Sequence, residues 1–370
     1  MKIGKITLDG YYNYGNLLQN YALQQVLLRY VEVVDTIWHS PNNFMPQVYW
    51  KWGWKEPIKL AINWKNFRTI FQSGKIGPEM VRQGKIRDWA DRYISIRQGV
   101  KDLRRISSEY DYFITGSDQV WNPYFSDKDN NLEDNFLEFA PLKKRLSYAA
   151  SIAAPEIPAN RRTLFQNGIN GMAQLSVREA AGAKLIYELT GRKAGVHVDP
   201  TMLLTTQEWD VVSRVPAWYK GDDYILTYFL GNRPDNVIYE LAKESGYKVV
   251  NLLDDSIYEH YVTGVDEFIW AIKHAKLMYT DSFHGTVFSV LYHTPFIVCN
   301  RVQDSVTEKM GSRLDTLLQS FKMTERRASA ENNYRIKNPF DEPDWDVAEN
   351  VLKVERERAN QYLREILSPY

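Results

Sequence analysis

The sequence predicts an α/β fold with two Rossmann-like domains that face a cleft, and three observations support it. The chain has 370 residues, which is too long for one ordinary core and suggests two domains of comparable size. Apolar runs of strand length alternate with stretches of helical periodicity, which is typical of parallel, doubly wound sheets. Several predicted strands end in small or polar residues, and ligands bind at that edge of such sheets. We therefore expect the functional site in the cleft.

The first predicted domain covers residues 1–195. It begins with a strand, a polar loop, a helix and a second strand, and the alternation is then interrupted over 38–105. Strands return after that region, each followed by a polar or small turn, and helices follow. We expect a strand at 2–8, a loop at 9–16, a helix at 17–30 and a strand at 31–37. Strands with their turns follow at 111–123 and 144–151, then a helix at 158–174 and a strand, turn and helix within 174–189. The segment 196–203, just past the predicted boundary, closes the first half of the alternation.

The second predicted domain covers residues 196–343, where the same alternation starts again. A strand with its turn at 224–232 is followed by a helix, and the pattern repeats until a buried strand at 295–300. The segments between them are helices at 235–246, 265–275 and 284–294 and strands at 247–253 and 276–281. A long helix at 344–367 ends the chain.

Composition narrows the class of protein. The 46 basic and 46 acidic residues leave no net charge, which argues against a nucleic-acid partner. The single cysteine, Cys299, excludes a disulfide within the chain and fits a reducing compartment. MKIGKITLDG passes directly into polar residues, so we expect no signal peptide. No apolar stretch approaches the roughly 20 residues that span a bilayer. We predict a cytoplasmic protein.

Two of the polar strand ends carry strong candidates for chemistry. In SVRE, Arg178 follows a strand and can bind a carboxylate or phosphate through two parallel hydrogen bonds; a structural ion pair is the alternative. In DSFHG, His284 lies beside a helix N-terminus and can move a proton near neutral pH. Ser282 can cap that helix, while Gly285 and its neighbour Thr286 offer backbone amides to an anion. A core histidine is the alternative reading of this motif.

The other two strand ends are weaker candidates. TGSDQVWNP could be a turn, or a sugar-binding set in which Trp121 stacks on a ring beside amide and carboxylate groups. The first loop, DGYYNYGN, has the glycines and asparagines of a phosphate turn without the spacing of a nucleotide fingerprint. The histidines are scattered, so we expect no metal site.

Six blocks taken together resemble the polysaccharide pyruvyl transferase family: NYGNLLQNYALQ, ITGSDQVWNP, LSYAASIA, LSVREAAGAKLI, VDPTMLL and YTDSFHGTVFSVLYHTPFI. Their order and spacing match over about residues 1–320. The resemblance implies a GT-B-like arrangement of the two domains, with a C-terminal helix, within 344–370, that crosses back to the first domain. It also implies transfer of a pyruvyl group from phosphoenolpyruvate to hydroxyls of a sugar or lipid-linked glycan. The expected products are a ketal and phosphate, and no cofactor is needed.

The resemblance also implies roles for individual residues. His284 matches the family histidine that would act as acid and base, and Arg178 matches an arginine that would hold the donor's carboxylate or phosphate. Asp118 is a further catalytic candidate, as a base or acceptor contact. Some members have an arginine where this chain has Ser282, so we expect Arg313 to supply that contact, with Lys309 behind it. The remaining candidate substrate-binding residues are Gly285, Thr286, Asn13, Asn16, Ser117, Gln119, Trp121, Asn122 and Ser176.

Three points stay open. Asn16 stands where many members have Asp, which weakens the hypothesis that the first loop holds a catalytic base. Region 38–105, with Trp50, Trp52 and Trp54, is either a variable insertion packed on its own domain or a surface that faces an acceptor, a partner or an anionic membrane. A GT-B glycosyltransferase that uses a sugar nucleotide, or a non-catalytic carbohydrate-binding protein, would share the same frame.

Overall fold

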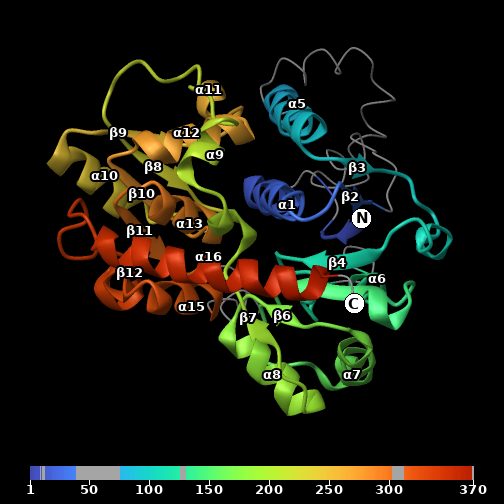
Figure 1. Cartoon of the computed structure of the whole chain (residues 1–370). Helices are drawn as coiled ribbons and strands as arrows, with labels where there is room; N and C mark the ends of the chain where they lie inside the picture. Colours follow the sequence, from blue (N-terminus) through green and yellow to red (C-terminus); the bar gives the residue numbers. More distant parts are fainter. Residues whose placement is uncertain (9, 11–12, 39–75, 126–130, 302–311, 369–370) are drawn as a thin grey trace, which may run out of the picture.

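The computed structural model describes residues 1–8, 10, 13–38, 76–125, 131–301 and 312–368. Within these residues the chain forms two parallel five-stranded sheets with helices packed around them (Figure 1). This arrangement confirms the predicted α/β class with two Rossmann-like units. No helix of the described residues is long and apolar enough to span a membrane.

The first sheet has the strand order β3-β2-β1-β4-β5, and all its pairings are parallel. This is the order of a doubly wound Rossmann half, so β1 and β4 end side by side at one edge. Register places Gly4 beside Asp35 and Phe113, in the buried centre of the sheet. The strands are β1 (Lys2–Ile6), β2 (Val33–Ile37), β3 (Ile96–Arg97), β4 (Tyr112–Gly116) and β5 (Arg145–Tyr148).

The second sheet has the order β12-β11-β10-β8-β9 and is also parallel throughout. Its central strands are buried along their full length, as expected for a sheet covered on both faces. The strands are β8 (Tyr224–Tyr228), β9 (Lys248–Asn251), β10 (Leu277–Thr280), β11 (Phe296–Cys299) and β12 (Arg327–Ala328).

A small parallel pair extends the first sheet. Strands β6 (Ser176–Val177) and β7 (Gly195–Val196) pair with each other, and isolated bridges connect Leu146 to Gln174 and Ala150 to Val177. The segment that carries Arg178 therefore ends at the same edge as β4 and β5.

Helices cover the sheets and connect the two halves. Helix α1 packs against both α12 and α13, so the first domain touches the second directly. The longer helices are α1 (Tyr14–Leu27), α5 (Ile76–Tyr93), α7 (Arg162–Gly171), α8 (Ala180–Thr190), α10 (Asp235–Ser245), α12 (Val265–His274), α13 (Phe283–Leu291), α15 (Ser312–Ser320) and α16 (Trp345–Leu367). Shorter helices are α6 (Leu132–Asn135), α9 (Thr206–Asp210) and α11 (Tyr258–Tyr261).

Helix α16 crosses from the second sheet back to the first, as expected (Figure 1). Near its start, Glu349 pairs with His293 of the second half at 2.9 Å. Near its end, the Tyr362 hydroxyl donates to the Ser147 carbonyl of β5 at 2.8 Å. The helix thus joins both halves. The domain boundaries at residues 195 and 343 stay predictions.

Three details of the predicted elements need correction. Helix α1 begins at Tyr14, three residues before the predicted start, because the Asn13 side chain caps it by accepting from the Asn16 amide. Part of the interrupted region is regular, since α5 and β3 lie within 76–97. The strand at 295–300 is followed by another, β12, so it is not the last. Trp50, Trp52, Trp54 and Lys309 lie outside the described residues.

Candidate functional site

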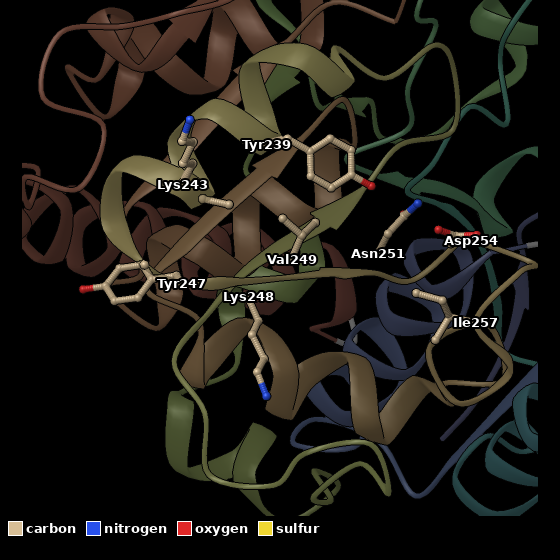
Figure 2. A pocket seen from close by; sticks show the side chains of 10 residues that line it. Tyr239, Lys243, Tyr247, Lys248, Val249, Asn251, Asp254 and Ile257 are labelled. Atoms are coloured by element: carbon tan, nitrogen blue, oxygen red, sulfur yellow. The ribbon is translucent and has the colours of Figure 1, made fainter.

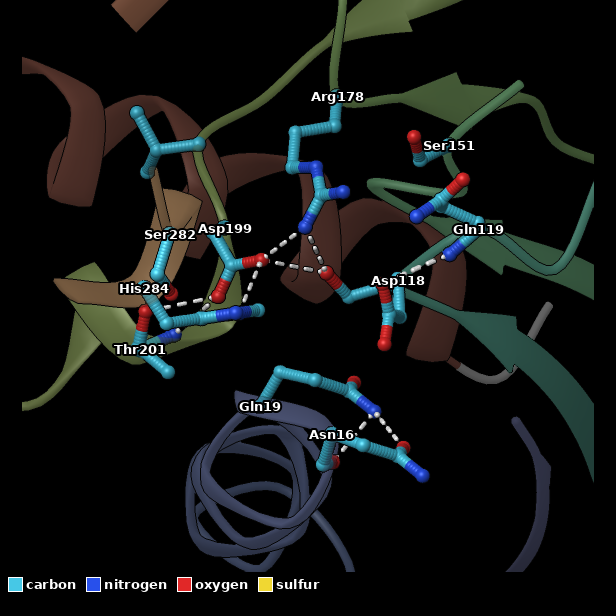
Figure 3. A network of polar contacts seen from close by, with 12 residues as sticks. Asn16, Gln19, Asp118, Gln119, Ser151, Arg178, Asp199, Thr201, Ser282 and His284 are labelled. Atoms are coloured by element: carbon cyan, nitrogen blue, oxygen red, sulfur yellow. Dashed lines mark hydrogen bonds and ion pairs between the residues drawn. The ribbon is translucent and has the colours of Figure 1, made fainter. Parts of the chain in front are cut away.

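The polar ends of β1, β4, β6 and β10 lead to one site between the halves of the molecule. Figure 3 shows side chains from the start of α1, the loop after β4, the residue after β6 and the start of α13 converging on it. Loops at this edge of parallel sheets are where ligands bind. The four segments are far apart in the sequence, so the fold brings them together.

Arg178 is buried and bound to a carboxylate. Its Nη1 atom donates to Asp199 Oδ2 at 2.5 Å, and its Nε atom lies 3.5 Å from Glu179 Oε1. The guanidinium also stacks on the Phe283 ring, 4.5 Å from the ring centre. One edge of this guanidinium therefore forms the structural ion pair that was the alternative reading. Its Nη2 atom has no hydrogen-bond partner among the residues that the structure describes.

Asp199 lies at the centre of the network. Its Oδ1 atom accepts from the backbone amide of Thr201 at 3.0 Å and from that residue's hydroxyl at 2.7 Å. Its Oδ2 atom accepts from the Ser117 hydroxyl at 2.8 Å as well as from Arg178. The same Oδ2 atom lies 3.4 Å from His284 Nε2. One carboxylate oxygen therefore faces both the guanidinium and the imidazole.

His284 is the second residue of α13 and is 6% exposed. Ser282 caps this helix through its hydroxyl, which fixes the first turn and with it the position of the ring. The contact of Nε2 with Asp199 is within ion-pair distance, but its angle does not meet hydrogen-bond geometry. We describe it as an electrostatic contact. Such contacts often tighten when a substrate binds.

Gly15 of α1 forms the other side of the histidine site. A methyl group at this position would overlap the imidazole at Nδ1. Glycine is therefore required here so that the helix can lie directly against the ring. The first domain touches the imidazole of the second through this contact.

Charges around Asp199 determine its ionisation. Burial alone would raise the pKa of the Asp199 carboxyl, but His284 and Arg178 together hold that pKa well below its usual range. Burial alone would lower the pKa of Arg178, and the charges of Asp199 and Glu179 outweigh it, so the pKa is raised. Both groups are therefore charged at neutral pH.

Arg313 lies near Arg178 and stacks on the same ring. Its guanidinium is 5.8 Å from the centre of Phe283. Burial, together with the charge of Arg178, lowers the pKa of Arg313 to about 10. Two guanidiniums that repel each other beside the same ring favour an anion close to both of them.

A cavity of about 90 Å³ lies beside these groups. Its lining includes Arg178, Asp199, Phe283 and Arg313, and α16 adds Arg358 together with Glu355, which forms an ion pair with it. Both halves and the crossing helix thus contribute to one cationic cavity.

Several buried polar atoms around this site have no hydrogen-bond partner within the described part of the chain. They belong to five side chains: Gln19 Oε1, Arg178 Nη2, Glu179 Oε2, His284 Nε2 and Arg313 Nε. Such atoms are rare in folded proteins, and each is costly unless a ligand or water satisfies it. Their concentration marks the site as a place for a polar ligand.

The backbone amides of Gly285 and Thr286, which we predicted to bind an anion, already donate hydrogen bonds within α13 and its cap. The Gly285 amide donates to Ser282 Oγ at 3.2 Å, and the Thr286 amide donates to the Ser282 carbonyl at 3.0 Å. A methyl at Gly285 would meet Met278 and Thr280, so this glycine allows close approach to β10 and not to a ligand. Ser282 and Thr286 are likewise capping and packing residues of α13.

The loop after β4 also needs correction. Trp121 is fully buried, stacks on Phe136 and donates to the Asn135 carbonyl, so its ring is not accessible to a sugar. Asn122 is fully buried and holds the turn through Gln119 and Tyr124.

Three further candidates have structural partners. The hydroxyl of Ser176 contacts His197 Nδ1 at 2.8 Å and accepts from the Ala149 amide. Asn13 caps α1, and the Asn16 amide group donates to the carbonyls of residues 8 and 10. These side chains shape the loops of the site.

Asp118, Ser117 and Gln119 do lie in the network shown in Figure 3 or border it. Asp118 is 8% exposed and has a left-handed backbone with φ of 61°, which is uncommon for a residue other than glycine. Such conformations cluster at functional sites. Asp118 therefore stays a candidate for the acceptor side.

Two residues of the site were not predicted from the sequence. Asp199 falls in the VDPTMLL block and Gly15 in the first loop, yet neither motif indicates that both contact His284. The sequence signal for Asp199 was its place before a proline, in a short segment between predicted elements.

A larger groove of about 560 Å³ lies elsewhere, along α10 and the edge strand β9 (Figure 2). Tyr239, Tyr247 and Lys248 are among its lining residues, and it contains none of the network around Asp199. The smaller cavity is the better candidate because the unpartnered charged atoms border it.

Comparison with known proteins gives a family match. The family model described as polysaccharide pyruvyl transferase matches residues 13–301, which is most of the chain. No curated protein matches significantly.

Among solved structures, the chain is similar to UDP-GlcNAc 2-epimerase from Methanocaldococcus jannaschii, with 12% identity, coverage of 96% of this chain and 99% of that one, and a TM-score of 0.43. It is similar to Anabaena Alr3699/HepE in complex with UDP and glucose, with 11% identity, coverage of 99% and 98%, and a TM-score of 0.44. It is also similar to E. coli ADP-heptose lps heptosyltransferase II, with 10% identity, coverage of 97% and 99%, and a TM-score of 0.37.

Proposed function

The chain belongs to the polysaccharide pyruvyl transferase family, and from this premise we propose that it moves a pyruvyl group from phosphoenolpyruvate to two hydroxyls of a sugar. The acceptor would be a unit of a cell-surface polysaccharide or its lipid-linked precursor. The products would be a cyclic ketal and phosphate. The proposal places the reaction in the cytoplasm, with a lipid-linked acceptor presented at the inner face of the membrane.

The reaction has two steps that involve protons. A proton added to the methylene carbon of phosphoenolpyruvate makes its central carbon electrophilic, and a first sugar hydroxyl then bonds to that carbon and loses its proton. A second hydroxyl bonds to the same carbon while the bond to the phosphate oxygen breaks. The two protons lost by the hydroxyls balance those gained by the methylene carbon and the leaving phosphate. No cofactor is required.

His284 is the group that we assign to proton transfer. An imidazole can give a proton to the methylene carbon and then take one from a hydroxyl, since both of its forms exist near neutral pH. The ring stands at the start of α13 between Asp199 and Gly15. Asp118, on the loop after β4, is our candidate for the acceptor hydroxyls.

Arg178 and Arg313 are the groups that we assign to the donor. Phosphoenolpyruvate carries a carboxylate and a phosphate group on the same carbon atom, and two guanidiniums match such a pair of anions. The unpartnered Nη2 of Arg178 and Nε of Arg313 are available to it. The observation that carries the proposal is this pair of arginines at a small cationic cavity, joined to His284 through one carboxylate.

The test is turnover with a panel of glycosides. The wild-type protein should release phosphate from phosphoenolpyruvate only when an acceptor is present, and the acceptor should gain the mass of pyruvate less one water. His284→Ala should lower both signals by on the order of 100-fold or more, because general acid–base catalysis contributes that much. His274→Ala, which removes an exposed histidine of α12, is the matched control and should react normally.

Two outcomes would contradict the proposal. One is an unchanged rate in His284→Ala. The other is thermal stabilisation by UDP- or GDP-sugars together with none by phosphoenolpyruvate, which would point to a sugar-nucleotide enzyme.

A further inference from the structure

We propose that Asp199 is a positioning residue, whose Oδ2 atom holds the imidazole of His284 beside the guanidinium of Arg178 and stabilises the imidazolium that acts as the acid. The inference rests on the proposed function for the identity of the reaction. It adds a residue that the sequence motifs did not indicate.

The first step of the argument is geometric. Oδ2 is 2.5 Å from Arg178 Nη1 and 3.4 Å from His284 Nε2, while Oδ1 is held by Thr201 and a second donor to Oδ2 comes from Ser117. The carboxylate is 1% exposed. Three hydrogen-bonding residues therefore fix its orientation before any ligand binds. The histidine ring contacts an oxygen atom whose position these other residues already determine.

The second step concerns charge. An imidazolium at His284 would stand near the guanidinium of Arg178 and in the first turn of α13, where the helix dipole is positive. Both effects disfavour a second cation in a buried site. Asp199 is the anion placed between the two groups, so it offsets this repulsion. On the opposite edge of the ring, α1 contributes Gly15, which does not titrate.

The third step concerns which part of the guanidinium remains free. Asp199 accepts a hydrogen bond from Nη1, and Glu179 lies near Nε, so Nη2 is the nitrogen without a hydrogen-bond partner among the described residues. The same carboxylate thus orients the acid and turns one nitrogen of the donor-binding arginine toward a ligand. Loss of Asp199 should affect both the rate and the binding of the donor.

The experiment compares Asp199→Asn with Glu267→Gln. Glu267 is also a buried carboxylate between the halves, 3% exposed and paired with Lys85 at 2.9 Å, but it lies outside the site. Asp199→Asn should lower kcat by on the order of 100-fold to 10,000-fold, as for other residues that orient a catalytic histidine. Its activity should also fall off at a lower pH than in the wild type, because the imidazolium has lost its neighbouring anion. Glu267→Gln should keep the wild-type pH profile.

A measurement without turnover separates this inference from the proposed reaction. In ¹⁵N-histidine NMR spectra at one pH near neutrality, His284 should show a smaller imidazolium fraction in Asp199→Asn than in the wild type; His284→Gln assigns the signal. If the wild type does not convert phosphoenolpyruvate but this change is seen, the proposed function fails and the role of Asp199 stands. In Asp199→Asn, an unchanged imidazolium fraction, or a lower kcat with an unmoved pH profile, would overturn the positioning role.

A second variant covers the case in which Asp199→Asn does not fold. Asp199→Glu keeps the charge and displaces it by one methylene group, so kcat should fall while the pH profile stays near that of the wild type. A wild-type kcat in Asp199→Glu would overturn the inference.

Discussion

Gly15 shows that a residue without a side chain can define a site. It lies in the first turn of α1, and a methyl group there would overlap the ring of His284. The position of the imidazole therefore depends on three contacts: the Ser282 cap of its own helix, Asp199 on one edge and Gly15 on the other.

The substitution Gly15→Ala tests this contact. The added methyl should push the ring out of place, and displacement of a catalytic group by about 1 Å can cost on the order of 100-fold in rate. We expect that loss in kcat/KM, with a circular dichroism spectrum like that of the wild type.

Gly84→Ala is the matched control. Gly84 is a helical glycine of α5 with open space where a methyl would lie. This variant should keep full activity and gain roughly 0.5–1 kcal/mol of stability, since alanine is the better helix former. Full activity in Gly15→Ala would show that the ring can move without consequence.

The site could be predicted from the sequence only in part. Motifs at strand ends indicate His284 and Arg178, and the structure brings both to one carboxylate. Asp199 and Gly15 were missed because their role depends on how the halves pack, and no local pattern records that packing. Trp121 was misjudged for the opposite reason: its motif suits a sugar site, but a neighbouring phenylalanine covers its ring.

At the scale of elements, α16 holds the two halves together. Arg356 on this helix donates to the carbonyls of Met202 and Leu204 at 2.8 and 2.9 Å, in the segment that follows Asp199. The helix therefore supports the chain that carries the central carboxylate.

Arg356→Ala should lower the free energy of unfolding by about 2 kcal/mol, because two partly buried carbonyls lose a charged donor. Thermal unfolding measures this change. Lys353→Ala, on the exposed face of the same helix, should change stability by less than about 0.5 kcal/mol. Equal melting temperatures for the two variants would contradict the role given to α16.

The elements themselves follow closely from periodicity. The alternation of apolar runs predicts both sheets, and the long apolar-striped segment at 344–367 predicts α16 to within one residue of its start. Region 38–105 was not interpretable in this way, because α5 is rich in charged residues and its apolar stripe is weak. Tertiary contacts with α11 and α12, such as the pair between Lys85 and Glu267, explain its helix better than its pattern does.

At the scale of the whole molecule, the stability of the fold should depend on pH through a buried histidine that packs against α16. His197 follows β7, packs on Tyr362 of α16 and lines the cavity. Burial, with a smaller effect of the Arg358 charge, lowers the pKa of His197 to about 4. The folded protein therefore keeps this ring neutral while the unfolded chain protonates it below about pH 6.5.

Stability should accordingly fall as the pH decreases from about 6.5 to 4, by on the order of 3 kcal/mol from this residue, and this loss should not grow further below pH 4. Asp199 acts in a lower range: its depressed pKa adds stability above about pH 4 that is lost only at more acidic pH. Melting temperatures between pH 4.5 and 7.5 separate the two. His197→Gln should show a flatter profile in this window, and an identical slope would contradict the assignment.

The most direct test of the central claim is a crystal structure of the protein with bound phosphoenolpyruvate. We expect the donor in the cavity beside Phe283, with its anionic groups on Arg178 and Arg313 and its methylene carbon within reach of the His284 ring. Donor density along β9 and α10, or none at saturating concentration, would contradict the account.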